Sequence, residues 1–494
     1  MQRFLNYSKI GVNHKEVALI QGKVFQPRLF VDSKWIAIWL SILAISFAIP
    51  QVEYVVVSYM SLRALKGGRY TMEAAIVVCF YILANSVFVV GATREALRYL
   101  FLLCGFLALF PKKNLGKISL VTWLWGFVLF FSLVSVFVSA FPAISILKVI
   151  SFFLGAYIMV KGFSQCKPYK VHFFRLLNAF FVFIVYSSLL LFLLGYGYEA
   201  NGRGFQGVFS HPQIFGPVMG VVTTWFLGLV LAQKSHSKFL YLTTAISLAF
   251  IFMSLARTGM VALLLGGGLA YLISFSRPQN HRFAGQAVKL AVGLVIAGIL
   301  FALSNPSFID DTLVSFIQKR EGAQGDASFN ELFNNSRGAL TLTSMDNFRA
   351  NPLLGIGFGV PSNVDAMEGV NSIKYLWGIP VSASVEKGFL PTAILEEIGI
   401  IGGITTLAFL LIPLNKIRKR FSFPTLWLFL TAILINIGEA IFYSVGGMGF
   451  FMWLIVGISF SFDFFVSSYD KKVQSNRGNT LNLVNTEKLP ITDR

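Results

Sequence analysis

Long apolar runs, separated by short polar segments, follow one another along most of the chain. They recur from Trp35 to Phe465. A helix of about 20 apolar residues crosses the roughly 30 Å hydrocarbon core of a bilayer. Apart from closed barrels, only helices satisfy all their backbone polar groups inside lipid. The pattern therefore predicts an all-α polytopic membrane protein with about 12–14 transmembrane helices and one large extracytoplasmic loop.

The individual runs define the candidate spans. Residues 35–62 are compatible with one tilted helix or with a short hairpin broken near Pro50, and the sequence leaves both alternatives open. The candidate spans are 35–49, 51–62, 72–91, 95–110, 118–140, 142–160, 171–197, 213–233, 239–256, 258–276, 287–305, 391–414, 423–445 and 447–466.

The composition agrees with a membrane protein. Of the 494 residues, 55% are hydrophobic and 13% are charged, whereas a soluble domain carries about 25% charged residues. The formal net charge is +19, but the basic residues lie mainly in short loops between spans, where they set membrane topology. We therefore expect no nucleic-acid partner. The cysteines, Cys79, Cys104 and Cys166, show no disulfide or metal-binding spacing.

Basic residues concentrate on one side of the predicted membrane. Six connecting loops, counted to the first basic residue of the following span, hold nineteen basic residues and no acidic one. By the positive-inside rule these loops face the cytoplasm, together with both termini. The opposite side carries residues 306–390, an 85-residue segment with nine acidic and six basic residues. Segments of this length are usually functional. The basic loops are 63–71, 111–117, 161–170, 234–238, 277–286 and 415–422.

The chain accordingly divides into five parts. The first has no signal-peptide pattern, and the last is polar enough to be disordered. The parts are a cytoplasmic segment at 1–34, transmembrane helices at 35–305 that include an outward motif loop at 198–212, the large extracytoplasmic loop 306–390, transmembrane helices at 391–466 and a cytoplasmic tail at 467–494.

Three arginines fall on the predicted outer side. Arg203 lies in "ANGRGFQGVFSHPQIFG", in which Gly204 and Gly207 permit close approach of the backbone. Arg257 lies in "SLARTG", between two apolar runs, and Arg337 lies in "NNSRGAL" of the large loop. A lone arginine at a membrane boundary is often a snorkelling charge. All three arginines lie on the same predicted side of the membrane, and this indicates a common function.

The large loop contains a glycine-rich motif. In "ANPLLGIGFG", glycines alternate with apolar residues at Gly355, Gly357 and Gly359. No strand–helix context precedes them, so the motif is not a dinucleotide fingerprint. We expect these glycines to shape the loop.

Charged residues flank and enter the next span. "SVEKGFLPTAILEEIGIIGG" places Glu386 and Lys387 before the span, and Glu396 and Glu397 one to two turns inside it. Carboxylates inside a membrane are costly and are usually functional or paired. These four residues are therefore candidates for a site or for an internal ion pair.

Outward arginines that lie close together fit a pyrophosphate. Guanidinium groups bind phosphate oxygens bidentately, and they stabilise a pyrophosphate leaving group as charge develops. In an outer membrane leaflet, a polyprenyl-diphosphate sugar carries such a group and needs no ATP. A base near the acceptor hydroxyl would complete the site.

The order of the motifs resembles the O-antigen ligase and O-antigen polymerase superfamily of bacterial membrane proteins. The order is "RGFQGVFSHPQ", "SLARTG", a large outer loop with "NPLLGIGFG", and "EKGFLPTAILEEIGIIGG", over roughly residues 200–410. The resemblance implies that Arg203, Arg257 and Arg337 bind the undecaprenyl-diphosphate donor, with Arg349 as the alternative to Arg337. It also implies an inverting glycosyltransferase that uses no metal or other cofactor.

The chain departs from the ligase pattern at one place. Ligases of the family carry a His-Asn pair just before the span that follows the large loop, where this chain has Glu386-Lys387. The large loop has no histidine, and His211 is the one histidine on the predicted outer side. The candidate catalytic residues are therefore Glu386, His211 and Arg337, and Lys387 is a further candidate for contact with the pyrophosphate.

The missing histidine favours a polymerase of undecaprenyl-diphosphate-linked oligosaccharide units, in O-antigen or exopolysaccharide synthesis. The alternative is an O-antigen ligase that transfers a finished glycan to lipid A-core or to another acceptor. A transporter or flippase is a second alternative, although the chain shows no paired repeat typical of transporters. The expected partners are the lipid-linked donor, a glycan or lipid acceptor, membrane lipid, a flippase and a chain-length regulator. The expected location is the bacterial inner membrane, with an extracytoplasmic active site.

Overall fold

Helices dominate the part of the chain that the computed structural model describes. The described residues are 33–84, 94–110, 120–198, 204–232, 237–274, 285, 338–362, 373–376, 379–383, 387 and 389–465. The predicted span 287–305 and the predicted tail 467–494 lie outside them.

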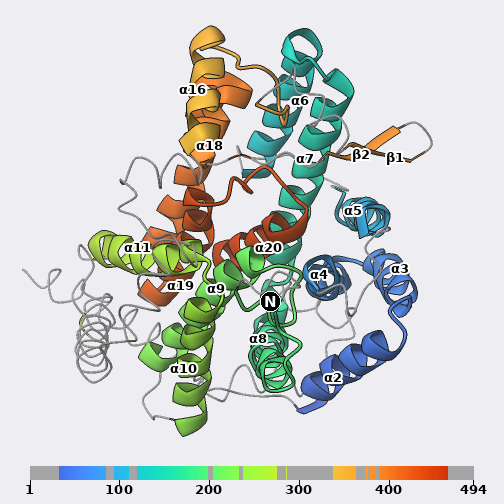
Figure 1. Ribbon diagram of the computed structural model, residues 1–494, viewed down its shortest axis with the longest axis vertical. Coiled ribbons are helices and arrows are strands. Elements are labelled where there is room, and N and C mark those ends of the chain that lie inside the picture. Colours follow the sequence, from blue (N-terminus) through green and yellow to red (C-terminus); the bar gives the residue numbers. More distant parts are fainter. Residues whose placement is uncertain are drawn as a thin grey trace, which may run out of the picture.

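The helices follow the apolar runs closely. Proline near the first turn of α7, α18 and α19 is compatible with helix formation, because an N–H there has no intrahelical partner. The 3-10 turns η2 and η5 adjoin α8 and α19, and β1 and β2 form an antiparallel hairpin. The bounds are α2 Ser33–Ala48, α3 Val52–Ala64, α4 Gly68–Leu83, α5 Arg94–Leu109, α6 Leu120–Val138, α7 Pro142–Gln165, η2 Lys167–Tyr169, α8 Lys170–Leu193, α9 Pro212–Ala232, α10 Lys238–Met253, α11 Arg257–Ser274, α16 Ala339–Ala350, β1 Ile373–Leu376, β2 Ile379–Ala383, α18 Leu390–Arg420, α19 Phe423–Leu434, η5 Ile435–Ile437 and α20 Gly447–Ser461 (Figure 1).

Six of the described helices are long and apolar enough to cross a membrane, judged by length and composition. They are α6, α7, α8 with η2, α9, α11 and α18, and five further apolar helices have 10–17 residues. These helices confirm the prediction of an all-α polytopic membrane protein. Helix α16 and the hairpin β1–β2 lie within the predicted large loop 306–390.

Residues 35–62 form two helices. Helix α2 ends at Ala48, and α3 begins at Val52 after a turn in which the Val52 N–H donates to the Ile49 carbonyl at 3.0 Å. Pro50 lies in this turn and has no N–H with which to continue a helix. Helix α2 packs on α8, and α3 packs on α4 and α5. The structure therefore answers the question that the sequence leaves open for this segment.

Segments predicted to face the cytoplasm meet at one end of the molecule. The buried Glu73 carboxylate accepts hydrogen bonds from Arg63 at 2.5 Å and from Arg69 at 3.0 Å. It also lies 2.8 Å from the His172 ring nitrogen at the start of α8. The end of α3 and the starts of α4 and α8 are thus joined through one carboxylate, which balances part of the local positive charge.

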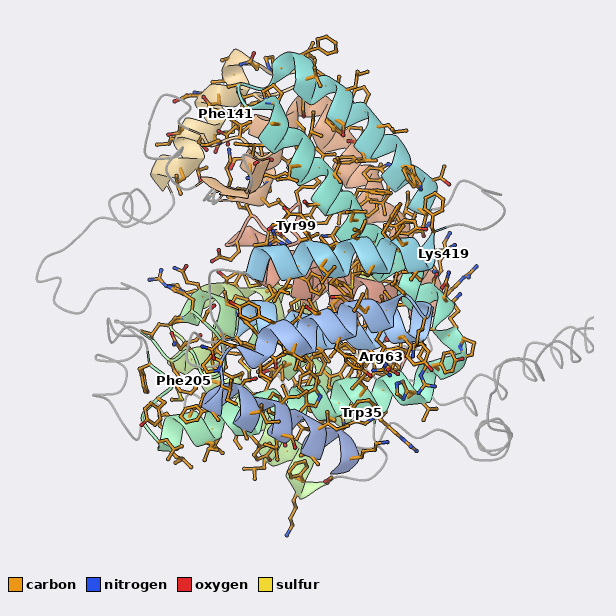
Figure 2. All side chains as sticks on the ribbon, turned by 90° about the vertical axis from the view of Figure 1, so that its right-hand side faces the viewer. Trp35, Arg63, Tyr99, Phe141, Phe205 and Lys419 are labelled. Carbon is orange, nitrogen blue, oxygen red and sulfur yellow. The ribbon has the colours of Figure 1, made fainter. Side chains whose placement is uncertain are left out.

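The two ends of the helices lie on opposite sides of the molecule. In Figure 2, Arg63 and Lys419 lie toward the right, whereas Phe141 and Phe205 lie toward the left. Arg63 and Lys419 lie in the last turns of α3 and α18, where the sequence predicts two of the basic loops. Phe141 and Phe205 belong to segments predicted to face outward. The arrangement agrees with the charge pattern of the sequence.

The predicted span 423–445 is too long. Helix α19 has 12 residues, which corresponds to about 18 Å at 1.5 Å per residue and is shorter than the roughly 30 Å of a hydrocarbon core. After η5 the chain is non-helical from 438 to 446 and then enters α20. The sequence did not predict that the helix ends here, because most residues of the segment are apolar and hydropathy does not distinguish a helix from a buried irregular segment.

The 438–446 segment lies deep between the long helices. Val445 packs against Gly155, in the middle of α7, where an added Cβ would collide with it. The hydroxyls of Tyr443 and Thr406, in the middle of α18, are hydrogen bonded. Non-helical backbone at membrane depth occurs where it is buried in protein or lines an aqueous cavity. Ser444 is exposed, so part of this segment reaches the surface of the described structure.

Candidate functional site

Helix α18 is broken at Gly399, and a distant segment fills the break. Gly399 has φ 63° and ψ −166°, which is not helical. The Ile356 N–H donates to the Glu396 carbonyl at 2.8 Å, and the Gly357 N–H donates to the Glu397 carbonyl at 3.1 Å. These bonds satisfy carbonyls that would otherwise be left without partners at a helix break inside a membrane.

The glycines of "ANPLLGIGFG" make this docking sterically feasible. Gly355, Gly357 and Gly359 all have positive φ, at 71°, 116° and 68°. A Cβ at Gly355 would collide with the backbone of Glu396 and Glu397 in α18, and one at Gly357 would lie 2.6 Å from the Ser139 Cβ. Only glycine combines this conformation with so close an approach.

A buried ion pair lies beside the break. The Lys387 ammonium donates to the Glu396 carboxylate at 2.6 Å, and the two side chains are 4% and 0% exposed. Ser344 and Asn347 of α16 also donate to Glu396, at 2.8 and 2.7 Å. Ser362 donates to it at 3.1 Å. Both carboxylate oxygens are therefore occupied, as a buried charge requires.

The second carboxylate holds the glycine loop. Glu397 accepts a hydrogen bond from the Gly359 N–H at 2.8 Å, and its other oxygen lies 3.9 Å from the Lys387 ammonium. The Lys148 ammonium on α7 donates to the Gly359 carbonyl at 2.8 Å. We call Lys148, Lys387, Glu396 and Glu397 the buried charge network. It balances two cations against two carboxylates and joins α7, α18 and the glycine loop.

Sequence reasoning identified three members of the network and missed the fourth. Lys148 is the basic residue within the predicted span 142–160. Intramembrane lysines are rare and tend to be functional or paired, so that signal was present in the sequence. Ser344, Asn347 and Ser362 were also missed, and isolated polar residues in a loop give no comparable signal.

Arg257 is the first residue of α11, at the end of that helix predicted to face outward. The α9–α11 contact that supports it is glycine-lined, because an added Cβ at Gly220 would lie 2.7 Å from the Gly259 carbonyl oxygen. Thr258 packs directly against Gly438, where an added Cβ would collide with it. The helix start that carries Arg257 therefore adjoins the beginning of the 438–446 segment.

The motif loop around Arg203 reaches the same junction. The Phe205 N–H donates to the Met253 carbonyl at 2.8 Å, and a Cβ at Gly204 would lie 2.6 Å from the Ser254 carbonyl oxygen. Position 204 requires glycine for two reasons: its φ is 83°, and a side chain there would collide with Ser254. The residues that follow Arg203 thus pack on those that precede Arg257.

His211 and Gly207 have structural roles in the described part of this loop. The His211 Nδ1 accepts the Gln213 N–H at 3.1 Å at the start of α9. Gly207 has φ 53°, and an added Cβ would lie 2.5 Å from the Ser188 hydroxyl. These contacts fix the entry into α9 and orient the imidazole.

Several predicted site residues lie outside the described part of the chain. They are Arg203, Arg337 and Glu386, whose described sequence neighbours are Gly204, Gly338 and Lys387. The alternative to Arg337, Arg349, is described. It is exposed on α16 and bonds Asp346 at 3.0 Å.

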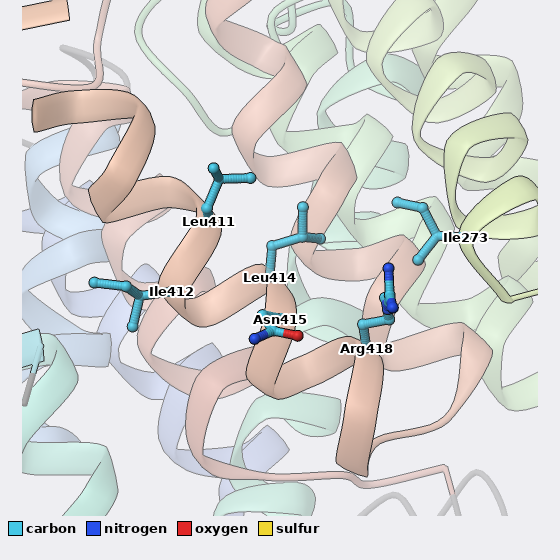
Figure 3. Close-up of a pocket in the computed structure, with 6 residues that line it drawn as sticks. All are labelled: Ile273, Leu411, Ile412, Leu414, Asn415 and Arg418. Atoms are coloured by element: carbon cyan, nitrogen blue, oxygen red, sulfur yellow. The ribbon is translucent and has the colours of Figure 1, made fainter. Parts of the chain in front are cut away.

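A separate groove lies at the opposite end of α18. It has a volume of about 460 Å³ and is lined by Ile273 of α11 and by residues 411–418 of α18, among them Asn415 and Arg418 (Figure 3). Arg418 lies in the last turn of α18, in a segment predicted to face the cytoplasm, whereas the buried charge network lies toward the end of α18 predicted to face outward. We therefore do not place the candidate site in this groove.

A comparison with known protein families found a match in the region that contains most of these contacts. Residues 242–408 match a family model described as O-antigen ligase. The matched region, about a third of the chain, includes Arg257, the glycine loop and three members of the buried charge network, Lys387, Glu396 and Glu397; Lys148 lies before it. No curated protein matches the chain. The family match confirms the resemblance of this multi-pass membrane protein to the O-antigen ligase and O-antigen polymerase superfamily.

Proposed function

We propose that the protein is a membrane glycosyltransferase that polymerises undecaprenyl-diphosphate-linked oligosaccharide units on the extracytoplasmic face. The family match supports a glycan-transferring protein. The observation that carries the proposal is the meeting, at one side of the molecule, of the Arg257 helix start, the loop that follows Arg203 and an irregular segment at membrane depth. Such a segment is compatible with a polar cavity in a helical membrane protein, since non-helical backbone at this depth is either buried in protein or lines such a cavity.

The donor diphosphate would bind the arginines. Arg257 starts α11 beside the 438–446 segment, and the residues next to Arg203 pack on the same junction. Guanidinium groups at these positions would bind the diphosphate bidentately. In the proposed arrangement Arg337, which belongs to the large loop, is the third arginine that binds the diphosphate. The positive charge stabilises the diphosphate as it leaves.

Glu386 would act as the base. Lys387, its neighbour, is buried and bonded to Glu396 at 2.6 Å. The structure thus gives the Lys387 ammonium a protein partner, so we assign Lys387 to positioning of Glu386 instead of contact with phosphate. His211, which caps α9 through Nδ1, is the alternative base.

The proposed reaction is a single displacement with inversion. The acceptor hydroxyl oxygen forms a bond to the anomeric carbon of the donor sugar, and the bond from that carbon to the diphosphate oxygen breaks. The hydroxyl proton passes to the Glu386 carboxylate, and undecaprenyl diphosphate leaves with the electron pair. Because guanidinium groups would balance the leaving charge, we propose that no metal is needed. Polymerisation by purified protein should therefore persist in excess EDTA, and its loss with recovery on adding Mg²⁺ would contradict this step.

We further propose that the protein lies in the bacterial inner membrane with both termini in the cytoplasm. This orientation rests on the basic loops, since Arg63, Arg69 and Lys419 belong to the side that the positive-inside rule assigns to the cytoplasm. A flippase would supply the lipid-linked units from the other leaflet, and a chain-length regulator would act on the same product.

Polysaccharide length in cells tests the proposal. Arg257→Ala at normal protein level should shorten the polymer to single repeat units, because the donor loses a diphosphate contact. Arg418→Ala, which removes an exposed arginine at the opposite end of the molecule, is the matched control and should leave long chains. Normal chain length with Arg257→Ala would be incompatible with the proposed role of Arg257.

Ligation is a second candidate function, because the matching family model is described as O-antigen ligase. The two functions differ in what accumulates when the gene is deleted. Loss of a ligase leaves long chains on undecaprenyl diphosphate, whereas loss of a polymerase leaves single units. Gel analysis of the lipid-linked glycans separates them.

A further inference from the structure

Arg98 has an unusual environment for a charged side chain in an apolar helix. It lies one turn into α5, a helix otherwise rich in leucine and phenylalanine. Among the described residues, its Nε is buried and has no hydrogen-bond partner. Its guanidinium carbon lies 5.0 Å from the centre of the Tyr99 ring. The Arg98 side chain is half-buried. A buried N–H without an acceptor is costly, so an anion that reaches this guanidinium would satisfy it.

The absence of a side chain at Gly446 leaves space for the Arg98 guanidinium. A Cβ at Gly446 would collide with Nη1 of Arg98. Gly446 ends the irregular 438–446 segment, and Gly438 at its other end packs on Thr258, next to Arg257. The two arginines therefore adjoin opposite ends of the same segment.

The surroundings of Arg98 connect it with the proposed base. Strand β2 packs on both α5 and α7, and its last residue, Ala383, is three residues before Glu386. On the α7 side, the Ser151 hydroxyl donates to the Tyr99 hydroxyl at 3.2 Å. The helix that carries Arg98 therefore contacts the strand that leads to the residue proposed to act on the acceptor hydroxyl.

We propose that Arg98 binds a phosphate of the acceptor, the second lipid-linked unit, while Arg257 binds the donor. The inference rests on the proposed polymerase function and adds to it a separate anion site. Its ligand is the diphosphate of a polyprenyl-linked oligosaccharide. A polymerase brings two such molecules together, so it needs two places for diphosphate. The 438–446 segment lies between the two arginines.

Two synthetic acceptor molecules distinguish binding at Arg98 from binding at the donor site. One carries the repeat oligosaccharide on polyprenyl diphosphate, with a methylene group in place of the anomeric oxygen so that it cannot serve as a donor. The other carries the same oligosaccharide on a neutral alkyl lipid. Transfer from a labelled, saturating donor is measured with purified protein in liposomes, over a range of concentrations of each acceptor.

Wild-type protein should have a lower KM for the diphosphate acceptor than for the neutral one. Arg98→Gln should raise the KM for the diphosphate acceptor about tenfold or more, since it removes a charge-assisted hydrogen bond. It should leave the KM for the neutral acceptor and for the donor unchanged. Retained transfer to the neutral acceptor also shows that the variant is folded.

Further variants sharpen the result. Gly446→Ala displaces the guanidinium and should give the same selective defect, whereas Arg98→Lys keeps the charge and should recover part of the preference. Arg257→Ala should reduce transfer to both acceptors equally. An equal loss on both acceptors with Arg98→Gln, a rise in the donor KM or an unchanged preference would overturn the assignment. No transfer by the wild type would instead refute the proposed function, and this inference with it.

Discussion

At the scale of single residues, the buried charge network holds the glycine loop against α7 and α18. Lys387 and Glu396 are 4% and 0% exposed and lie 2.6 Å apart. Removing one partner of such a pair leaves the other charge buried, whereas replacing both by apolar residues is often nearly neutral. Lys148 extends the network to α7 through the Gly359 carbonyl.

Lys387→Met should therefore lower the free energy of unfolding by about 3–5 kcal/mol. The double variant Lys387→Met with Glu396→Leu should recover most of that loss, because no charge is left unpaired. Thermal unfolding in detergent measures both. Arg349→Met, which breaks an exposed pair with Asp346, is the control and should change stability little. A double variant as unstable as the single one would argue against a compensated ion pair.

At the scale of elements, α18 works as two helices joined at Gly399. The Ile400 N–H donates to the Pro352 carbonyl at 2.9 Å, so the loop bonds both sides of the break. The backbone conformation at Gly399 is close to one that only glycine adopts. The break and the glycine loop are therefore one structural unit, although more than 40 residues separate Gly355 from Gly399.

Gly399→Ala should destabilise the protein by at least about 1–3 kcal/mol. The added methyl is strained at φ 63° and collides with the Leu353 carbonyl. Gly403→Ala, one turn further along α18, is the matched control, because its Cβ would meet only the Leu395 side chain at 3.4 Å. Unfolding midpoints and limited proteolysis of the glycine loop measure the difference. Equal behaviour of the two variants would mean that the break is not required.

At the scale of the whole molecule, the basic residues gather at one side, and the opposite side is the one that we propose faces outward. Cysteine labelling tests this in intact cells, and the three native cysteines are buried and so should react slowly. A membrane-impermeant maleimide should label Leu353→Cys in the glycine loop, where Leu353 is 63% exposed. It should label Arg418→Cys only after lysis. The reverse pattern would invert the proposed orientation.

Apolar runs and charge predicted much of this arrangement. The runs located the described helices, because length and hydropathy decide what crosses lipid. Intramembrane carboxylates pointed to Glu396 and Glu397, and alternating glycines pointed to the loop that docks on them. These signals are local, so a single sequence contains them.

Other features depend on tertiary contacts and were beyond the sequence. The pairing of the Lys387 ammonium with the Glu396 carboxylate is set by the fold of the large loop. The early end of α19 was missed because residues 423–445 carry a single charged residue, Glu439, and otherwise continue the apolar run. Arg98 was hidden within a predicted span, and only its buried Nε distinguishes it from a snorkelling arginine.

Polymerisation by purified protein tests the central claim most directly. Wild-type protein in liposomes, given undecaprenyl-diphosphate-linked repeat units and no nucleotide sugar, should produce a ladder of longer lipid-linked chains and release undecaprenyl diphosphate. Arg257→Ala should produce neither, at equal protein and with an unchanged unfolding midpoint. Movement of the lipid across the membrane without formation of any glycosidic bond, by wild-type protein, would contradict the account.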